Sequence, residues 1–193
     1  MANSGVNVAD IDVSAANDER INHGEVAIVE PGLQEELTQA LESGRFHATT
    51  EQVHANAYII AVLTPFTDTH NVDMKFIYSA AESIAPQLKS DELIVLESTS
   101  PPQTTAKIAK RLLELRPGLA TDCIENTDNK PVIYFAHCPQ RILPGKAVEE
   151  LWSNNASSVA ELRRQPAAPR RFTLRSVTGS FCPLVMSLRR EPS

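Results

Sequence analysis

Short apolar runs alternate with helical patterns along the first 140 residues, and this alternation restricts the possible folds more than any other feature. The runs are continuous, rich in Val, Ile and Tyr, and are found at Val6–Ile11, Ala57–Leu63, Leu93–Leu96 and Pro131–Ala136. Such runs are typical of strands buried on both faces. Between them, apolar residues at helical spacing predict helices over Ala15–Asn22, Pro31–Gly44, Asp73–Leu88 and Thr104–Leu115, the first capped by Ser14. This order predicts an α/β fold with a parallel sheet.

Charge and composition argue against several classes of protein. The formal net charge is −6, so nonspecific binding to nucleic acid through phosphate neutralisation is not expected. No apolar run approaches the roughly 20 residues that span a bilayer, so no membrane segment is expected either. The three cysteines fit a reducing cytoplasm better than a disulfide scaffold, and the five histidines show no metal-ligand spacing. We therefore expect a cytoplasmic protein without a metal centre.

Polar residues follow each predicted strand, at the edge where open parallel sheets bind ligands. Asp12 follows the first run, Thr64 the second, and Glu97–Ser100 and His137–Arg141 follow the third and fourth. A carboxylate in the position of Asp12 suits the ribose hydroxyls of NAD, although an Asp after a strand is also common as a helix cap. The seven glycines form no Gly-x-Gly-x-x-Gly turn, because no two are closer than eight residues apart. The usual strand and turn for a dinucleotide diphosphate are therefore missing from this sequence.

Seven motifs between residues 6 and 146 carry a resemblance to a known family. They are Val-Asn-Val-Ala-Asp-Ile-Asp (6–12), Ile-Asn-His-Gly-Glu (21–25), Ile-Val-Glu-Pro-Gly-Leu (28–33), Ala-Val-Leu-Thr-Pro-Phe (61–66), Ser-Ile-Ala-Pro-Gln-Leu (83–88), Leu-Glu-Ser-Thr-Ser-Pro-Pro-Gln-Thr-Thr (96–105) and His-Cys-Pro-Gln-Arg-Ile-Leu-Pro-Gly-Lys (137–146). In order and spacing they resemble the UDP-glucose/GDP-mannose dehydrogenase family, most closely its branch that oxidises UDP-N-acetyl-D-mannosamine. The resemblance implies an incomplete Rossmann-like parallel sheet that lacks the first glycine-turn unit.

The same resemblance implies a chemistry and a set of site residues. Family members are homo-oligomeric enzymes of polysaccharide biosynthesis that use two NAD⁺ to oxidise C6 of a nucleotide sugar, through a thioester on a cysteine. Asp12 would hold the adenosine ribose of NAD, and Thr64 and Thr105 would line the cofactor groove. Thr99 would lie near the nicotinamide and the reacting carbon. Two further residues, Arg141 and Ile142, would contact the UDP-sugar.

Several family features are altered or missing. Leu63 stands where a proline is usual, Gln103 where a glycine is usual, and Gln140 where a glutamate is expected to handle the water that cleaves the thioester. An amide cannot accept that proton. Neither a Gly-Gly-x-Cys nucleophile nor the motif of the catalytic lysine occurs in the sequence. We therefore expect the chain to be inactive alone.

The family likeness ends at Asn155, where the composition also changes. Residues 156–193 hold seven Arg and no Lys, and their apolar residues follow no period of 2 or 3.6. We expect 1–155 to form a partial NAD-binding domain and 156–193 to be an irregular, non-family tail that arises from a shifted reading frame. Two alternatives remain open: a non-catalytic module that binds a nucleotide or UDP-sugar, and a functionless gene fragment.

Overall fold

Two parallel sheets form the centre of the protein in the computed structural model, which describes residues 1–26, 28–65, 73–121, 128–138, 145–146 and 148. The smaller sheet pairs β1 with β2, and the larger has the order β3-β4-β6-β5. The strands are β1 (Val8–Ile11), β2 (Phe46–Thr49), β3 (Ala57–Ile60), β4 (Leu93–Leu96), β5 (Ala120–Thr121) and β6 (Val132–His137). All the strand pairs are parallel, so the carboxyl ends of the strands in each sheet lie at one edge.

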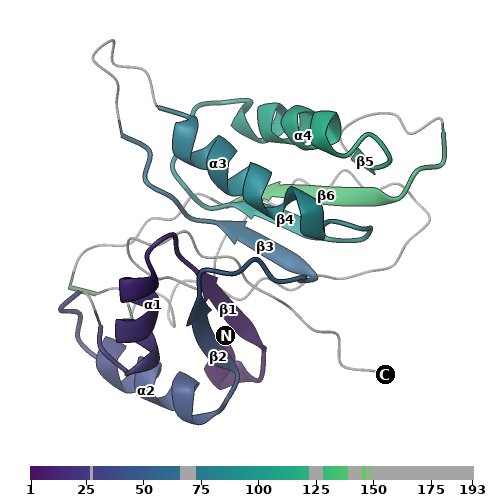
Figure 1. Ribbon diagram of the computed structural model, residues 1–193. Helices are drawn as coiled ribbons and strands as arrows, with labels where there is room; N and C mark the ends of the chain where they lie inside the picture. The colour runs from purple at the N-terminus through teal and green to yellow at the C-terminus, as the bar shows by residue number, and fades with distance from the viewer. Residues whose placement is uncertain (27, 66–72, 122–127, 139–144, 147, 149–193) are drawn as a thin grey trace.

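Helices cover the sheets in two groups (Figure 1). The smaller sheet carries α1 (Ala15–Asn22) and α2 (Leu33–Glu42), whereas α3 (Lys75–Ile84) and α4 (Thr104–Leu115) pack side by side against the larger one. Short 3-10 turns, η1 (Ala2–Ser4) and η2 (Ala85–Gln87), precede β1 and follow α3. Pro86 lies in η2, because a proline cannot continue the α-helical hydrogen-bond pattern.

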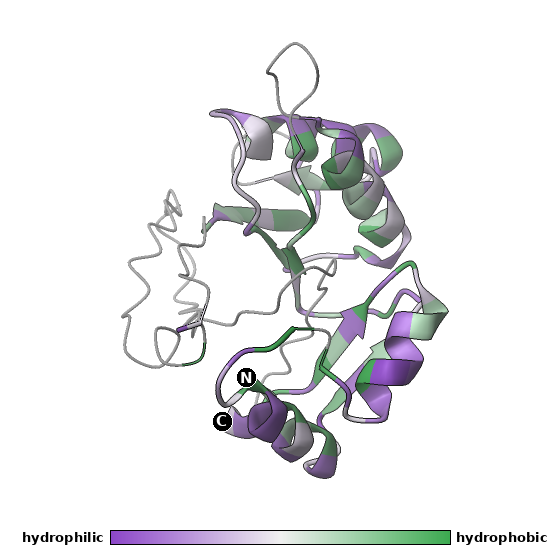
Figure 2. Cartoon of the chain, turned by 90° about the vertical axis from the view of Figure 1, so that its left-hand side faces the viewer, coloured by the Kyte–Doolittle hydropathy of each residue, from purple (hydrophilic) through white to green (hydrophobic). Residues whose placement is uncertain are grey.

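The core has two layers, one on each face of the strands. Tyr58 and Ile60 of β3 pack with α3 and α4, whereas Ala57 and Ile59 point to the opposite face and pack with β1 and η1. Alternate residues of a strand point to opposite faces, so a strand buried on both sides needs apolar residues at every position. Figure 2 shows this distribution, with hydrophobic colour along the strands and hydrophilic colour over the outer helix surfaces.

The predicted elements agree with the structure in type and differ mainly at their ends. The strand predicted from Val6 begins at Val8, and the one predicted to Leu63 ends at Ile60. Helix α2 begins at Leu33 rather than Pro31, after Gly32 in a left-handed conformation. Two strands, β2 and β5, were not predicted. The first has mixed, half-exposed residues, and the second is only two residues long. The tail predicted over 156–193 lies outside the described residues.

Candidate functional site

Asp12 lies directly after β1, at the start of α1, and is buried. Its Oδ1 accepts the Ser14 N–H at 3.0 Å and its Oδ2 accepts the Asn17 Nδ2 at 2.9 Å. Ser14 in turn caps α1, since its Oγ accepts the Asn17 N–H at 3.4 Å. These contacts fix the carboxylate against the helix start. The contacts of Asp12 thus show the role at the helix start that the sequence left open, and its binding of a ribose stays a prediction.

Two further acidic residues, Asp10 and Asp18, lie close to Asp12 and are buried as well. Among the described residues, one carboxylate oxygen on each of them is shielded from solvent and has no hydrogen-bond partner. Burial, together with the charges of Asp12 and Asp18, raises the pKa of Asp10 to about 7. The pKa of Asp18 is also raised, by burial and by Asp12. Asp10 was missed from the sequence, although it lies two residues before Asp12, a spacing that directs both side chains to the same side of an extended segment.

The carboxyl ends of β3 and β4 are joined by Ser98. Its Oγ accepts the Val62 N–H at 2.8 Å and donates to the Val62 carbonyl at 2.7 Å. The backbone adds bonds from Glu97 N–H to the Ile60 carbonyl and from Cys138 N–H to the Leu96 carbonyl. These bonds bring the residues that follow β3, β4 and β6 to one edge of the larger sheet. The sequence had placed Ser98 at this edge without assigning it a role.

Thr64, Glu97 and Thr99 come to this edge as the sequence predicts. Thr99 is exposed, Thr64 is half-buried, and Ser100 Oγ lies 3.5 Å from His137 Nε2. Glu97 is half-buried, and burial raises its pKa to about 7. A carboxyl group with such a pKa can hold or release a proton near neutral pH.

The first turn of α4 lies beyond the same edge. Thr104 is buried, and its Oγ1 donates to the Pro101 carbonyl at 2.8 Å, whereas the neighbouring Thr105 is half-buried. Gln103 caps the helix with φ 70° and ψ 6°, in the left-handed region, and makes no side-chain cap bond. A glycine adopts this conformation without steric cost, which gives a physical reason for the glycine that the family usually carries there.

A second contact joins parts of the chain that are far apart in sequence. The Gly145 N–H donates to Glu30 Oε1 at 2.7 Å, and a Cβ added to Gly32 would meet the Val148 side chain at 3.6 Å. Glu30 and Gly32 of the Ile-Val-Glu-Pro-Gly motif therefore lie against Gly145 and Val148. Three predicted site residues, Gln140, Arg141 and Ile142, lie outside the described residues.

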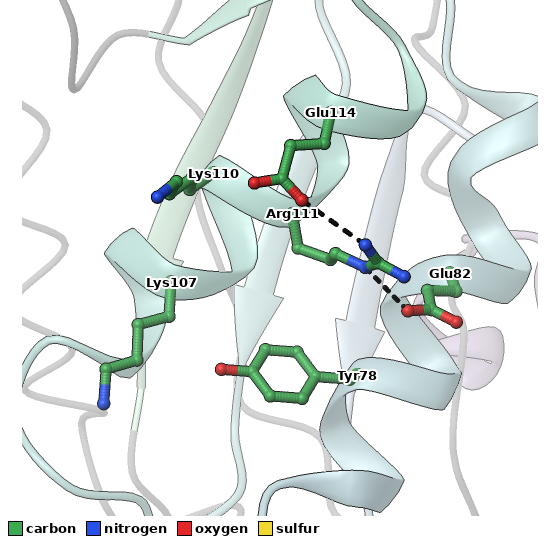
Figure 3. A pocket seen from close by; sticks show the side chains of 6 residues that line it. All are labelled: Tyr78, Glu82, Lys107, Lys110, Arg111 and Glu114. Atoms are coloured by element: carbon green, nitrogen blue, oxygen red, sulfur yellow. Dashed lines mark hydrogen bonds and ion pairs between the residues drawn. The ribbon is translucent and has the colours of Figure 1, made fainter.

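A hollow of about 420 Å³ lies on the solvent side of α3 and α4 (Figure 3). Arg111 crosses it and pairs with Glu82 of α3 at 2.8 Å and with Glu114 of its own helix at 3.3 Å. These partners, by hydrogen bonding above all, raise the pKa of Arg111. Because Arg111 pairs with Glu82 and Glu114, we interpret this hollow as a solvent-exposed contact between α3 and α4 rather than as a ligand site.

Over the described part of the chain, no group of three or more His, Cys, Asp or Glu side chains is placed to hold a metal ion. The helices in that part include none that is both long and apolar enough to cross a membrane.

Known proteins are similar to this chain in sequence and in fold. The family model for the NAD-binding domain of the UDP-glucose/GDP-mannose dehydrogenase family matches residues 1–162. UDP-N-acetyl-D-mannosamine dehydrogenase of Escherichia coli K12 is 42% identical over 148 residues, which are 77% of this chain and 35% of that protein. NDP-N-acetyl-D-galactosaminuronic acid dehydrogenase of Ralstonia nicotianae is 40% identical over 148 residues, 77% of this chain and 34% of that protein.

Solved structures show the same partial correspondence. The UDP-N-acetyl-mannosamine dehydrogenase Cap5O from S. aureus superposes with a TM-score of 0.69 and 35% identity, covering 78% of this chain and 34% of that one. The chain thus spans about a third of the length of the relatives it matches. With the match to the family model over residues 1–162, this chain belongs to the UDP-glucose/GDP-mannose dehydrogenase family and corresponds to its NAD-binding domain.

Proposed function

We propose that this chain is the NAD-binding part of a cytoplasmic nucleotide-sugar dehydrogenase that oxidises UDP-N-acetyl-D-mannosamine for polysaccharide biosynthesis. The observation that supports this most directly is Asp12, a buried carboxylate at the end of a parallel strand and at the start of a helix. The choice of sugar rests on the relatives, several of which are UDP-N-acetyl-D-mannosamine dehydrogenases.

The residues at the edge fit the adenosine side of NAD. The Asp12 carboxylate accepts hydrogen bonds from Ser14 and Asn17, and in our proposal it would also accept the ribose hydroxyls. Thr64 and Thr105 are half-buried at the same side of the sheet and would line the groove. The sequence provides no glycine-rich turn for the diphosphate, so the fit is limited to the ribose side.

Oxidation of the sugar would take place beside Thr99. NAD, when bound, supplies the hydride acceptor for this chemistry. Thr99 is exposed at the carboxyl edge and would contact the reacting sugar, while Arg141 would offer its guanidinium fork to an anionic group of the nucleotide. Because the 193 residues include no Gly-Gly-x-Cys nucleophile and carry Gln140, we expect no turnover by this chain alone.

Ligand-dependent stability tests the proposal. Binding to the folded state alone stabilises it by RT ln(1 + [L]/Kd), which is about 1.4 kcal/mol at ten times Kd. We expect NAD to raise the melting temperature of the chain, and Asp12→Asn to remove most of that increase. The matched control is Asp91→Asn, because Asp91 precedes β4 at the opposite end of the strands and should leave the NAD response intact. An unchanged response in Asp12→Asn would contradict the role of Asp12.

A second candidate is a binding module without catalysis, favoured by Gln140 in place of the family glutamate. Reduction of NAD, followed by absorbance in the presence of UDP-N-acetyl-D-mannosamine, separates the candidates. Stabilisation by UDP-sugar without reduction supports the module, and reduction by the isolated chain contradicts our expectation of inactivity. Stabilisation by neither NAD nor UDP-sugar would favour a functionless fragment.

A further inference from the structure

Asn17, in the first turn of α1, closes a ring of hydrogen bonds around the side chain of Asp12. Its Nδ2 donates to Asp12 Oδ2 at 2.9 Å, and the Ser14 N–H donates to Asp12 Oδ1 at 3.0 Å. Ser14 Oγ in turn accepts the Asn17 N–H at 3.4 Å. Each oxygen of the Asp12 carboxylate is thus held by a donor from the start of α1, one from the backbone and one from a side chain.

The bond from the Asn17 side chain does not cap α1. The backbone groups left without an intrahelical partner in the first turn of a helix are N–H donors, so a capping side chain must offer an acceptor, as Ser14 Oγ does. An ionised carboxylate only accepts hydrogen bonds, so Asn17 must present its amide NH₂ group to Asp12. The side chain of Asn17 therefore acts on the carboxylate, whereas that of Ser14 serves the helix.

The side chains around Asp12 show why a neutral donor matters there. The negative charges of Asp12 and Asp18 both raise the pKa of Asp10, so the three carboxyl groups lie close together. Ionised carboxylates repel one another and have no hydrogen to donate, so they cannot fix the orientation of Asp12. The amide of Asn17 holds the Asp12 carboxylate without adding a positive charge that would neutralise it. The negative charge of Asp12 therefore stays available to a ligand that donates hydrogen bonds.

We propose that Asn17 is a positioning residue for the ribose: it fixes the plane of the Asp12 carboxylate and thereby determines how strongly this chain prefers a ribose to a sugar without hydroxyls. This role rests on the proposed function, in which Asp12 accepts the ribose hydroxyls. A carboxylate held at both oxygens has its rotation about the Cβ–Cγ bond restricted, whereas one held at a single oxygen turns more freely. The sugar ring keeps its two neighbouring hydroxyls at a fixed spacing, so a carboxylate that is already oriented binds them at a lower entropic cost.

Two nucleosides that differ only in the ribose hydroxyls test this role with the full 193-residue chain. Calorimetric titration gives the Kd of adenosine and the Kd of 2′,3′-dideoxyadenosine, and the ratio of the two values reports on the hydroxyls alone. We expect wild type to bind adenosine at least about tenfold more tightly than the dideoxy compound. Asn17→Leu keeps a side chain of similar size and loses the donor, so it should reduce that ratio about fivefold. A merely structural loss would weaken the binding of both nucleosides equally and leave the ratio unchanged.

Asn22→Leu is the matched control, with the same substitution in the same helix. The Asn22 side chain accepts the Ala48 N–H and donates to the Ala48 carbonyl, both at 2.8 Å, so it joins the end of α1 to β2. Its loss removes two hydrogen bonds of the fold and none of Asp12. Asn22→Leu should therefore lower the melting temperature and leave the ratio of Kd values as in wild type. If Asn17→Leu fails to fold, as judged by circular dichroism, Asn17→Ala decides, because it also lacks the donor and should reduce the ratio in the same way.

Several outcomes would overturn this role of Asn17, and they separate it from the proposed function. A large ratio in wild type that Asn17→Leu leaves unchanged would show that Asp12 binds the ribose without help from Asn17, and the proposed function would stand. A ratio that falls equally in Asn22→Leu would show that Asn17 acts only through the packing of α1. Equal Kd values in wild type, or binding of neither nucleoside at millimolar concentration, would contradict the binding of ribose by Asp12 itself.

Discussion

Gln103 occupies a backbone conformation that favours glycine, and replacing it tests how the start of α4 is built. At φ 70° and ψ 6° its Cβ is crowded by the following carbonyl, which costs about 1–2 kcal/mol for a residue other than glycine. Gln103→Gly removes that cost but adds about 0.5–1 kcal/mol through the greater freedom of glycine in the unfolded chain. The Gln103 side chain is exposed and makes no cap bond, so no other interaction is lost. We expect a net gain of about 0.5–1 kcal/mol.

Equilibrium urea unfolding followed by circular dichroism measures this gain, with a melting-temperature rise of about 2–4 °C per kcal/mol as a second readout. Gln103→Ala keeps the Cβ and should leave stability unchanged. The other control is Gln39→Gly, at an exposed position inside α2, which should lose about 0.5–1 kcal/mol because glycine is unfavourable within a helix. Equal stability of Gln103→Gly and Gln103→Ala would refute the argument from backbone strain.

Three further predictions follow from the contacts of the site and of the helices. Between pH 3.8 and about 7, Asp10 is protonated in the folded chain and ionised in the unfolded chain. The free energy of unfolding should therefore fall as pH rises through this range, by about 4 kcal/mol in total. Asp10→Asn should reduce the pH dependence of this free energy, measured by urea unfolding between about pH 5 and pH 8. Glu97 acts in the same direction from pH 4.5 to about 7, so a pH dependence of stability that is unchanged from wild type in the double variant with Glu97→Gln would contradict this account. Ser98→Ala should lower the free energy of unfolding by about 2 kcal/mol in the same assay, because both backbone groups of Val62 lose their hydrogen-bond partner. A loss near zero would show that these two hydrogen bonds do not stabilise the contact between the ends of β3 and β4. Arg111→Ala should change the melting temperature little, since its ion pairs are exposed and screened by salt; a large decrease that persists in high salt would contradict this view of the hollow.

The sequence predicted the elements whose signal is local. Ser14 followed by Ala15–Asn22 carries a cap and a helix in one segment, and the structure confirms both. β2 was missed because Phe46–Thr49 gains its strand conformation from pairing with β1, on a partly exposed surface with no clear apolar pattern. At the candidate site, the sequence predicted the place of Asp12 after the first strand but not the role of Ser98, since the hydrogen bonds of Ser98 to Val62 depend on how two strands align.

If the chain binds a nucleotide as we propose, charge at the Asp12 edge should determine which part of the nucleotide lies there. Asp10, Asp12 and Asp18 together disfavour a diphosphate close to β1, whereas a ribose donates hydroxyls to a carboxylate and carries no charge. We therefore expect adenosine to bind this chain at least as tightly as ADP at about pH 8, where Asp10 is ionised, and the preference for adenosine to shrink at about pH 5, where Asp10 is protonated. Calorimetric titration of both ligands at the two pH values measures this, with Asp10→Asn as the variant that should lose the pH dependence. Tighter binding of ADP than of adenosine at the higher pH would show that cationic side chains or backbone N–H groups bind the diphosphate. The acidic residues would then not determine which part of a nucleotide this chain binds.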